Sequence, residues 1–378
     1  MPSKKHQKHS HIEKPSGGQY HRNEWTILGA PCGIISQLIS DLSQTLETNG
    51  HTCGYLDMEH QAIDMESTWT TQLTDKINHS QFTSRRNLHR YDYKKLFLDL
   101  DLLFVNGNHF SGQKQIAIVN EKKKDSLHRK LDRLTDLKVV VLDEGLSKPF
   151  DYLAEYIKPS TEIISITEVE RLADILRESL TMAPLHGLIL AGGKSQRMGT
   201  NKVDITYHDK PQALHEAGLI STHCTQVHLS VSEQKLSEAP TPYPQLPDTF
   251  IGLGPYGAIL SAFRSNPNVA WLTLACDLPY LNEATIKQLV SQRNPSKLAT
   301  CFYNPETDFP EPLITIWEPR AYPTLLDFMS QGQSCPRKVL INSDIEMIRM
   351  AEPFRMKNAN TPEERDEAKI FLSARKEN

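Results

Sequence analysis

Short apolar runs alternate with amphipathic helical patterns along most of the chain, and this alternation restricts the possible fold most strongly. The first helical pattern places Ile35, Leu38, Ile39, Leu42 and Leu46 on one face of a helix. Strands that are joined through helices in this way pair in parallel, so we predict an α/β architecture. The expected strands are Trp25–Leu28, Gly54–Leu56, Leu102–Val105, Ile116–Val119, Val139–Leu142, Leu188–Leu190, Val227–Val231, Val269–Ala275, Leu298–Tyr303 and Leu313–Trp317.

The alternation occurs in two successive regions, and we predict two domains. A helix from Thr167 to about Leu180 closes the first region, with Thr167 and Glu170 at the spacing of a capping box. Pro184 cannot continue that helix, so Met182-Ala183-Pro184 is interpreted as a linker. The polar, His- and Lys-rich start of the chain cannot bury enough apolar surface to fold. The expected division is a disordered tail over 1–22, a first domain over 23–183 and a second over 184–378.

Composition excludes several classes of protein. Lys and Arg number 42 against 46 Asp and Glu, a net charge of −4, whereas general nucleic-acid binders have a basic excess. No apolar run approaches the roughly 18 residues that a membrane span requires. The six cysteines show no C-x-x-C or zinc-finger spacing, which is typical of reduced thiols in a cytoplasmic protein. We therefore expect no nucleic-acid partner, no membrane and a cytoplasmic location.

The segment from Leu190 to Lys202, L-A-G-G-K-S-Q-R-M-G-T-N-K, follows an expected strand and carries the clearest functional pattern. Glycines let backbone N–H groups approach a phosphate closely. Arg197 can form bidentate hydrogen bonds to phosphate oxygens, and Lys202 adds a compact positive charge. The pattern matches neither G-x-x-x-x-G-K-[ST] nor G-x-G-x-x-G, so the P-loop and the dinucleotide fingerprint do not apply. The alternative interpretation is an ordinary strand-to-helix turn with solvated basic residues.

This segment resembles the signature loop of the molybdenum cofactor guanylyltransferases, L-A-G-G-x-S-x-R-M-G-x-x-K, and the resemblance extends from about His186 to the C-terminus. The resemblance implies a Rossmann-like nucleotidyltransferase fold, in which one sheet lies between two layers of helices (αβα). The Asp of the family's C-D-x-P-Y corresponds to Asp277, which makes Asp277 the expected Mg²⁺ ligand. Asp248 corresponds to a nucleotide-contacting Asp, although the glycine spacing after it is altered. Asn358 and Asn360 match N-x-N-T-P-E-E and are expected to face the acceptor side, the alternative being turn residues that cap the last helix.

The same resemblance favours guanine over cytosine. The guanylyl branch carries L-A-G-G and N-x-N-T-P, as this chain does, whereas the cytidylyl branch tends to carry L-A-A-G and D-x-D-T-P. Two departures are Asn201, where the family often has Asp, and Ser230, where related enzymes can place Asn. The residues expected to bind the nucleotide are Leu190, Ala191, Gly192, Gly193, Lys202, Ser230, Asp248 and Asp277.

The resemblance implies transfer of GMP from GTP to the phosphate of the molybdenum–molybdopterin cofactor, with release of pyrophosphate. The nucleophile is already an anionic phosphate, so charge neutralisation and alignment are the main tasks. The expected catalytic residues are Lys202, Arg197 and Asp277, with Mg²⁺ on Asp277. The expected partners are GTP and the molybdopterin cofactor, together with molybdoenzymes or their chaperones. The alternatives are a nucleotidyltransferase that uses CTP or a sugar-phosphate acceptor, and a non-catalytic cofactor-binding scaffold.

The first domain contains a segment that matches the P-loop pattern only in part. Laid on G-x-x-x-x-G-K-[ST], the segment from Gly29 to Ser36 keeps the first Gly and the final Ser, but Ile34 and Ile35 replace the second Gly and the Lys. The segment D-L-L-F-V-N-G at 101–107 resembles D-L-V-L-V-E-G of the molybdopterin-guanine dinucleotide adapter proteins, with Asn106 in place of Glu. The resemblance implies a P-loop-like αβα fold that does not hydrolyse GTP. The alternative is an unrelated α/β domain.

Overall fold

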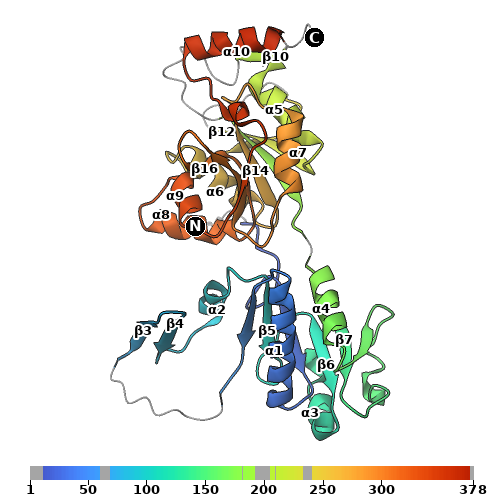
Figure 1. Ribbon diagram of the computed structural model, residues 1–378. Helices are drawn as coiled ribbons and strands as arrows, with labels where there is room; N and C mark the ends of the chain where they lie inside the picture. The colour runs from blue at the N-terminus through green and yellow to red at the C-terminus, as the bar shows by residue number, and fades with distance from the viewer. Residues whose placement is uncertain are drawn as a thin grey trace, which may run out of the picture. The chain divides into compact units, whose positions relative to one another are not determined.

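The computed structural model describes residues 12–59, 69–180, 182–191, 205–208, 210–232 and 241–374. They form two compact units (Figure 1). The N-terminal unit contains the described residues between 17 and 180, and the C-terminal unit contains those from 182 onward together with 12–16. Each unit has its own sheet and its own hydrophobic core.

The N-terminal unit is built on a parallel sheet with the strand order β2-β5-β1-β6-β7-β8. Apolar side chains of α1 and α4 pack on one face, and those of α3 and η3 pack on the other, which gives three layers. A separate hairpin, β3–β4, follows β2. The elements are β1 (Glu24–Leu28), α1 (Cys32–Thr48), β2 (Cys53–Leu56), β3 (Thr71–Asp75), β4 (Ser80–Ser84), α2 (Arg90–Leu96), β5 (Leu102–Asn106), β6 (Gln115–Val119), η1 (Glu121–Lys123), α3 (Lys124–His128), η2 (Leu131–Arg133), β7 (Leu137–Leu142), η3 (Asp151–Leu153), β8 (Glu162–Ser165) and α4 (Val169–Glu178).

The C-terminal unit has a mixed sheet with the order β13-β12-β9-β14-β16-β15-β17, in which β16 runs antiparallel to both of its neighbours. Helices α5 and α7 cover one face, and α6, α8 and α9 cover the other. The elements are β9 (Leu185–Leu190), β10 (Thr206–His208), β11 (Lys210–Pro211), α5 (Gln212–Ser221), β12 (Gln226–Val231), β13 (Gln245–Pro247), α6 (Pro255–Ser265), β14 (Ala270–Ala275), α7 (Glu283–Ser291), β15 (Ala299–Asn304), β16 (Phe309–Trp317), α8 (Ala321–Ser330), α9 (Pro336–Ile341), β17 (Glu346–Arg349), η6 (Pro353–Met356) and α10 (Pro362–Ala374).

Strand β9 shows how the sequence pattern produces the layers. Successive side chains of a strand point to opposite faces. Accordingly Leu188 and Leu190 pack with α6, while Ile189 packs with α5 and α7. In the N-terminal unit, the buried residues of α1 are the five that the helical periodicity indicated. The prediction of two three-layer α/β units is confirmed, and the strands that it expected are all present within a few residues.

The start of the chain differs from the disordered tail expected over 1–22. Residues 1–11 lie outside the described part, but Tyr20 and His21 are buried. The reason is the buried Glu24 carboxylate, which accepts hydrogen bonds from the backbone N–H groups of Gln19, Tyr20 and His21. A buried carboxylate requires such partners, and they order the segment.

The expected capping box at Thr167 and Glu170 is wrong. Helix α4 begins at Val169, and Glu168, not Thr167, occupies its N-cap position. The Glu168 carboxylate accepts a hydrogen bond from the Ser165 N–H, and Glu170 instead accepts one from Thr45 of α1. The last helix, α10, begins with a capping box, since Thr361 Oγ1 accepts from the Glu364 N–H and the Glu364 carboxylate accepts from the Thr361 N–H.

Within the residues that the structure describes, no helix is both long enough and apolar enough to span a membrane. All six cysteines are free thiols.

Two neighbouring histidines should make the C-terminal unit sensitive to acid. Burial lowers the pKa of His228 to about 4, with a further contribution from His186, whose own pKa burial also lowers. Their rings lie 5.9 Å apart and both contact Trp271. The unfolded chain takes up these protons near its ordinary His pKa of about 6.5 and the folded chain does not, so stability is complete above that pH and is lost as the pH falls toward 4.

We expect the free energy of unfolding to fall by about 2 kcal/mol between pH 7 and pH 4.5 on account of His228, after a discount for its partial exposure. The measurement is urea unfolding at both pH values, followed by tryptophan fluorescence. His228→Gln should reduce the difference between the two pH values, and an unchanged difference would contradict the assignment.

Candidate active site

The carboxyl ends of four adjacent strands meet at one edge of the C-terminal sheet. Ala275 of β14 pairs with Leu190 of β9, Leu190 pairs with Ser230 of β12, and Ser230 pairs with Leu246 of β13. From β9 the chain continues to β12 on one side and later returns to β14 on the other. Ligands of open α/β sheets bind at the carboxyl edge at such a reversal of strand order.

Asp277 lies at this edge, two residues beyond β14, and its side chain is half-buried. The Ala359 N–H donates to the Asp277 carbonyl oxygen over 2.9 Å, and the Cys276 thiol donates to the Leu190 carbonyl over 3.3 Å. Ala359 is buried between the exposed Asn358 and Asn360. The structure therefore brings the predicted acceptor-side asparagines next to the predicted metal ligand, although 80 residues separate them in sequence.

Ser230 and Asp248 form a hydrogen-bonded pair on the other side of β9. The Ser230 hydroxyl donates to the Asp248 carboxylate over 2.7 Å, and the Asp248 N–H donates to the Val231 carbonyl over 2.9 Å. Burial raises the pKa of the Asp248 carboxyl, and the Ser230 bond acts against that rise. The Ser230 carbonyl accepts from the Ala191 N–H, which links this pair to the last described residue before the glycine-rich loop.

Sequence reasoning missed a buried polar pair on α5. Gln212 donates from Nε2 to Glu216 Oε1 over 3.0 Å and to the Leu278 carbonyl over 3.3 Å, and so supports the segment after Asp277. Burial raises the pKa of Glu216 well above its usual range, and the charge of Asp277 adds to this. Both effects favour the protonated form of Glu216. The sequence feature that could have indicated this pair is its spacing, because Gln212 and Glu216 lie at i and i+4 on an otherwise apolar helix face.

The donor chemistry at this edge fits a hard divalent cation. Mg²⁺ prefers oxygen ligands and is commonly held by one or two carboxylates together with substrate phosphates. Asp277 supplies one carboxylate, and burial favours the protonated form of the nearby Glu216. Throughout the described ranges no group of three or more His, Cys, Asp or Glu side chains is arranged to hold a metal. A single carboxylate suits a cation that arrives with phosphates.

The remaining predicted site residues lie on the glycine-rich loop. Gly192, Gly193, Arg197 and Lys202 all fall outside the described residues. Leu190 and Ala191, which lead into that loop, are buried at the carboxyl end of β9.

Residues 187–346 match the family model described as "MobA-like NTP transferase domain". The C-terminal unit thus contains a segment similar to this family, the MobA-like domain. The matched range contains the Ser230–Asp248 pair and Asp277, and it ends before Asn358.

Two curated relatives and one solved structure are similar to parts of the chain. A "molybdenum cofactor biosynthesis bifunctional protein" of Synechocystis sp. is 35% identical over 189 residues, which cover 50% of this chain and 54% of the relative. A "probable molybdenum cofactor guanylyltransferase" of Flavobacterium johnsoniae is 26% identical over 194 residues, which cover 51% of this chain and 100% of the relative. The match thus spans about half the length of the Synechocystis protein. The crystal structure of a MobB protein homologue from Bacillus stearothermophilus is 18% identical, covers 42% of this chain and 97% of its own, and has a TM-score of 0.31.

In the N-terminal unit, the segment from Gly29 to Ser36 that was compared with a P-loop begins with a tight turn and carries no charged side chain. Gly29 has φ +96, and a Cβ there would lie 2.3 Å from the Ile118 carbonyl oxygen, so glycine is required. Ile35, which replaces the P-loop Lys, is fully buried in the core beneath α1. Asn106, which replaces the family's Glu, is buried and donates from Nδ2 to Asp57 Oδ1 over 2.8 Å.

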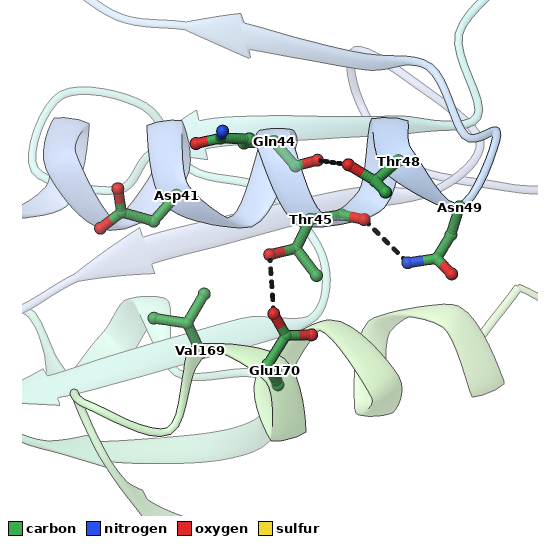
Figure 2. A pocket seen from close by; sticks show the side chains of 7 residues that line it. All are labelled: Asp41, Gln44, Thr45, Thr48, Asn49, Val169 and Glu170. Carbon is green, nitrogen blue, oxygen red and sulfur yellow. Dashed lines mark hydrogen bonds between the residues drawn. The ribbon is translucent and has the colours of Figure 1, made fainter.

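A groove of about 410 Å³ lies between α1 and α4 of the same unit (Figure 2). Its residues are Asp41, Gln44, Thr45, Thr48, Asn49, Val169 and Glu170. The Thr48 hydroxyl and the Asn49 amide donate to backbone carbonyls of α1 itself, and Thr45 donates to Glu170 over 3.5 Å. The lining carries two carboxylates and no cation, so it does not suit a nucleotide phosphate.

Proposed function

We propose that the MobA-like domain transfers GMP from GTP to the terminal phosphate of the molybdenum–molybdopterin cofactor and releases pyrophosphate. The observation that carries the proposal is the carboxyl edge of the sheet, where the Ser230–Asp248 pair lies on one side of β9 and Asp277 with the adjoining Asn358–Asn360 segment lies on the other. The printed names of the Synechocystis and Flavobacterium relatives support the choice of substrates.

In this proposal each side of the edge has its own substrate. Ser230 and Asp248 contact the nucleotide on the β12 side, and Asn358 and Asn360 face the pterin acceptor on the β14 side. Asp277 would hold Mg²⁺, which when bound neutralises phosphate charge. The reacting phosphate of the acceptor is already anionic, so the protein does not need a strong general base.

The glycine-rich loop completes the proposed site. Leu190 and Ala191 position the loop, the Gly192 and Gly193 amides and Arg197 bind the β- and γ-phosphates, and Lys202 stabilises charge at the α-phosphate. Positioning and charge neutralisation then supply most of the rate.

The deciding experiment is incubation of the full chain with molybdenum cofactor, Mg²⁺ and labelled GTP, in which we expect labelled dinucleotide and an equal amount of pyrophosphate. Parallel reactions contain CTP, ATP or UTP. If transfer is faster from CTP than from GTP, the protein is a cytidylyltransferase and not a guanylyltransferase. If the chain binds the cofactor but releases no pyrophosphate from any nucleotide, it is a non-catalytic scaffold.

We also propose that the N-terminal unit neither binds GTP tightly nor hydrolyses it, because Ile35 is buried where a P-loop would present a Lys. The expected result is about one GTP bound per chain in equilibrium dialysis with Mg²⁺, all of it at the MobA-like domain. Two sites of similar affinity, or GTP hydrolysis without acceptor, would contradict the proposal.

The proposal extends to location and recipients. Free thiols at all six cysteines are consistent with a reducing compartment, and we place the protein in the cytoplasm. Molybdoenzymes or their chaperones would receive the dinucleotide product.

A further inference from the structure

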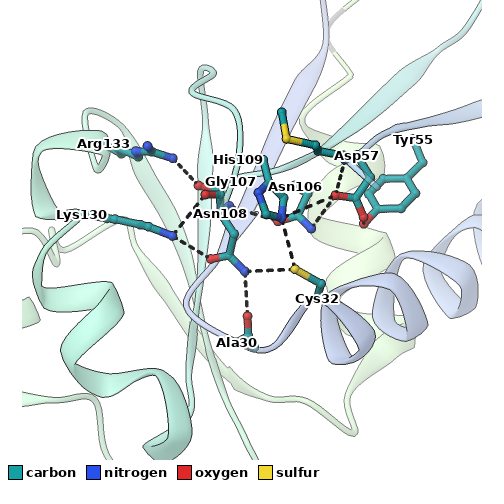
Figure 3. Close-up of polar contacts among 11 residues, drawn as sticks. Ala30, Cys32, Tyr55, Asp57, Asn106, Gly107, Asn108, His109, Lys130 and Arg133 are labelled. Atoms are coloured by element: carbon teal, nitrogen blue, oxygen red, sulfur yellow. Dashed lines mark hydrogen bonds and ion pairs between the residues drawn. The ribbon is translucent and has the colours of Figure 1, made fainter. Parts of the chain in front are cut away.

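Three side chains with complementary chemistry meet at one edge of the N-terminal sheet (Figure 3). Cys32 is the first residue of α1, His109 follows β5, and Asp57 follows β2. Strands β1, β5 and β2 are parallel neighbours whose carboxyl ends are level, with Ile27 opposite Asn106 and Leu56 opposite Val105. The loops after these strands are therefore adjacent, although residues 32, 57 and 109 are far apart in sequence.

His109 faces both the thiol and the carboxylate. Its Nε2 lies 3.3 Å from Cys32 Sγ and 4.0 Å from Asp57 Oδ1. An imidazole in this position can take the thiol proton, and a carboxylate at ion-pair distance stabilises the imidazolium that results. Both contacts are made by the same ring nitrogen, so Asp57 acts as a nearby counter-charge to the imidazolium. A thiol next to an imidazolium is a recognised setting for a cysteine nucleophile.

Neighbouring groups hold these three side chains in place. Asp57 accepts from Asn106 Nδ2 over 2.8 Å and from the Tyr55 hydroxyl over 2.5 Å. Burial, and then Asp57, raise the pKa of Tyr55, so the hydroxyl stays a donor. On the other side Asn108 Nδ2 donates to the Ala30 carbonyl over 2.8 Å and lies 3.8 Å from Cys32 Sγ.

The surroundings are basic and accessible. Lys130 donates to the Asn108 carbonyl over 3.2 Å, and Arg133 donates to the Gly107 carbonyl over 2.8 Å. Burial lowers the pKa of Lys130, Arg133 and Lys123 lower it further, and Cys32 acts in the opposite direction. Cys32 is half-buried, and a Cβ added to the adjacent Gly33 would meet nothing within 4 Å. A small anionic molecule can therefore approach from the Gly33 side.

The other cysteines lack these properties. Burial raises the pKa of the Cys53, Cys224 and Cys301 thiols to about 12. Cys276 is buried and donates to the Leu190 carbonyl. Cys335 is exposed, on the N-terminal side of the short helix α9, and provides an ordinary thiol for comparison.

We propose that Cys32, activated by His109 and Asp57, is a site of reversible mixed-disulfide formation with small anionic disulfides. His109 takes the proton of Cys32, and the thiolate attacks one sulfur of the disulfide. The S–S bond of the disulfide breaks, the other half leaves as a thiolate, and His109 returns the proton to it. Cys32 is oxidised and the leaving half is reduced, so the exchange needs no further oxidant. This proposal does not depend on the guanylyl transfer proposed above.

The test treats the full chain with oxidised glutathione at pH 7 and follows each cysteine by peptide mapping. We expect glutathionylation of Cys32 at least about tenfold faster than of Cys335 in the same sample, and full reversal by dithiothreitol. His109→Gln should bring Cys32 to the rate of Cys335 or below. His128→Gln is the matched control, because His128 belongs to the same unit but contacts Tyr152 and not this cluster. If His109→Gln lowers the melting temperature, Asp57→Asn gives the same comparison.

A second arm uses the neutral disulfide of 2-mercaptoethanol. The Cys32-to-Cys335 rate ratio should be several-fold smaller than with oxidised glutathione, because Lys130 and Arg133 attract the anion. The proposal is overturned if Cys32 reacts no faster than Cys335, if neither substitution slows it, or if the neutral disulfide gives the same ratio.

Discussion

Replacing Asp277 with Asn lowers the rate of dinucleotide formation by about 10²–10³-fold. The substitution keeps the shape of the side chain but removes the charge that would hold Mg²⁺ at the carboxyl end of β14. The backbone bond from the Ala359 N–H to the Asp277 carbonyl does not involve the side chain, so the fold should persist. The measurement is pyrophosphate release from GTP and molybdenum cofactor over a range of Mg²⁺ concentrations, since part of the loss should be recovered at high Mg²⁺.

The matched control is Asp327→Asn, which removes an exposed carboxylate on α8 of the same domain. It should leave both the turnover and the Mg²⁺ dependence unchanged. Near-normal turnover of the Asp277 variant, with an unaltered requirement for Mg²⁺, would remove Asp277 from the proposed mechanism.

Replacing Glu318 with Gln destabilises the C-terminal unit by about 3–5 kcal/mol. Arg293 binds Glu318 through two contacts, Nε to Oε1 over 2.6 Å and a terminal nitrogen to Oε2 over 2.9 Å. Both side chains are at most 5% exposed, so the substitution leaves the guanidinium buried without a counter-charge. The free energy of unfolding, measured with urea at pH 7, gives the size of the loss.

Two further variants identify the cause of that loss. The double substitution Arg293→Met with Glu318→Leu should cost less than the single one, because no unpaired charge remains buried. Asp344→Asn breaks the exposed Lys297–Asp344 pair and should change stability by less than about 1 kcal/mol. Equal losses for the single and double variants would show that packing, not the unpaired charge, is responsible.

Much of the candidate site follows from local sequence. A buried apolar run followed by Cys276-Asp277 places a carboxylate at the end of a strand, and strand ends of a parallel sheet meet at one edge. Thr361 and Glu364 form their capping box within four residues, so the start of α10 could be predicted from the sequence as well. Asn358 and Asn360 could be placed near that start, but their closeness to Asp277 depends on the Ala359–Asp277 bond.

Contacts between distant segments could not be predicted in this way. The Gln212–Glu216 pair lies under the segment after Asp277 only because α5 packs on that face of the sheet. The assignment of residues 17–22 to a tail failed because a carboxylate further along the chain, at Glu24, binds their backbone. Polarity alone indicated a tail, since local composition does not show which buried group will need partners.

The sequence by itself determined the α/β class, the strands and the principal helices, and the residue types of a phosphate-handling edge. These features depend on short-range periodicity and on the chemistry of neighbouring residues, and both can be recognised directly in the sequence. Only the tertiary structure decided that Cys32, Asp57 and His109 meet, and that Ser230 binds Asp248 on one side of β9 while Asn358 and Asn360 lie near Asp277 on the other. The physical reason is the order of parallel strands, which brings the ends of β1, β2 and β5, or of β12, β9 and β14, to one edge whatever their separation along the chain.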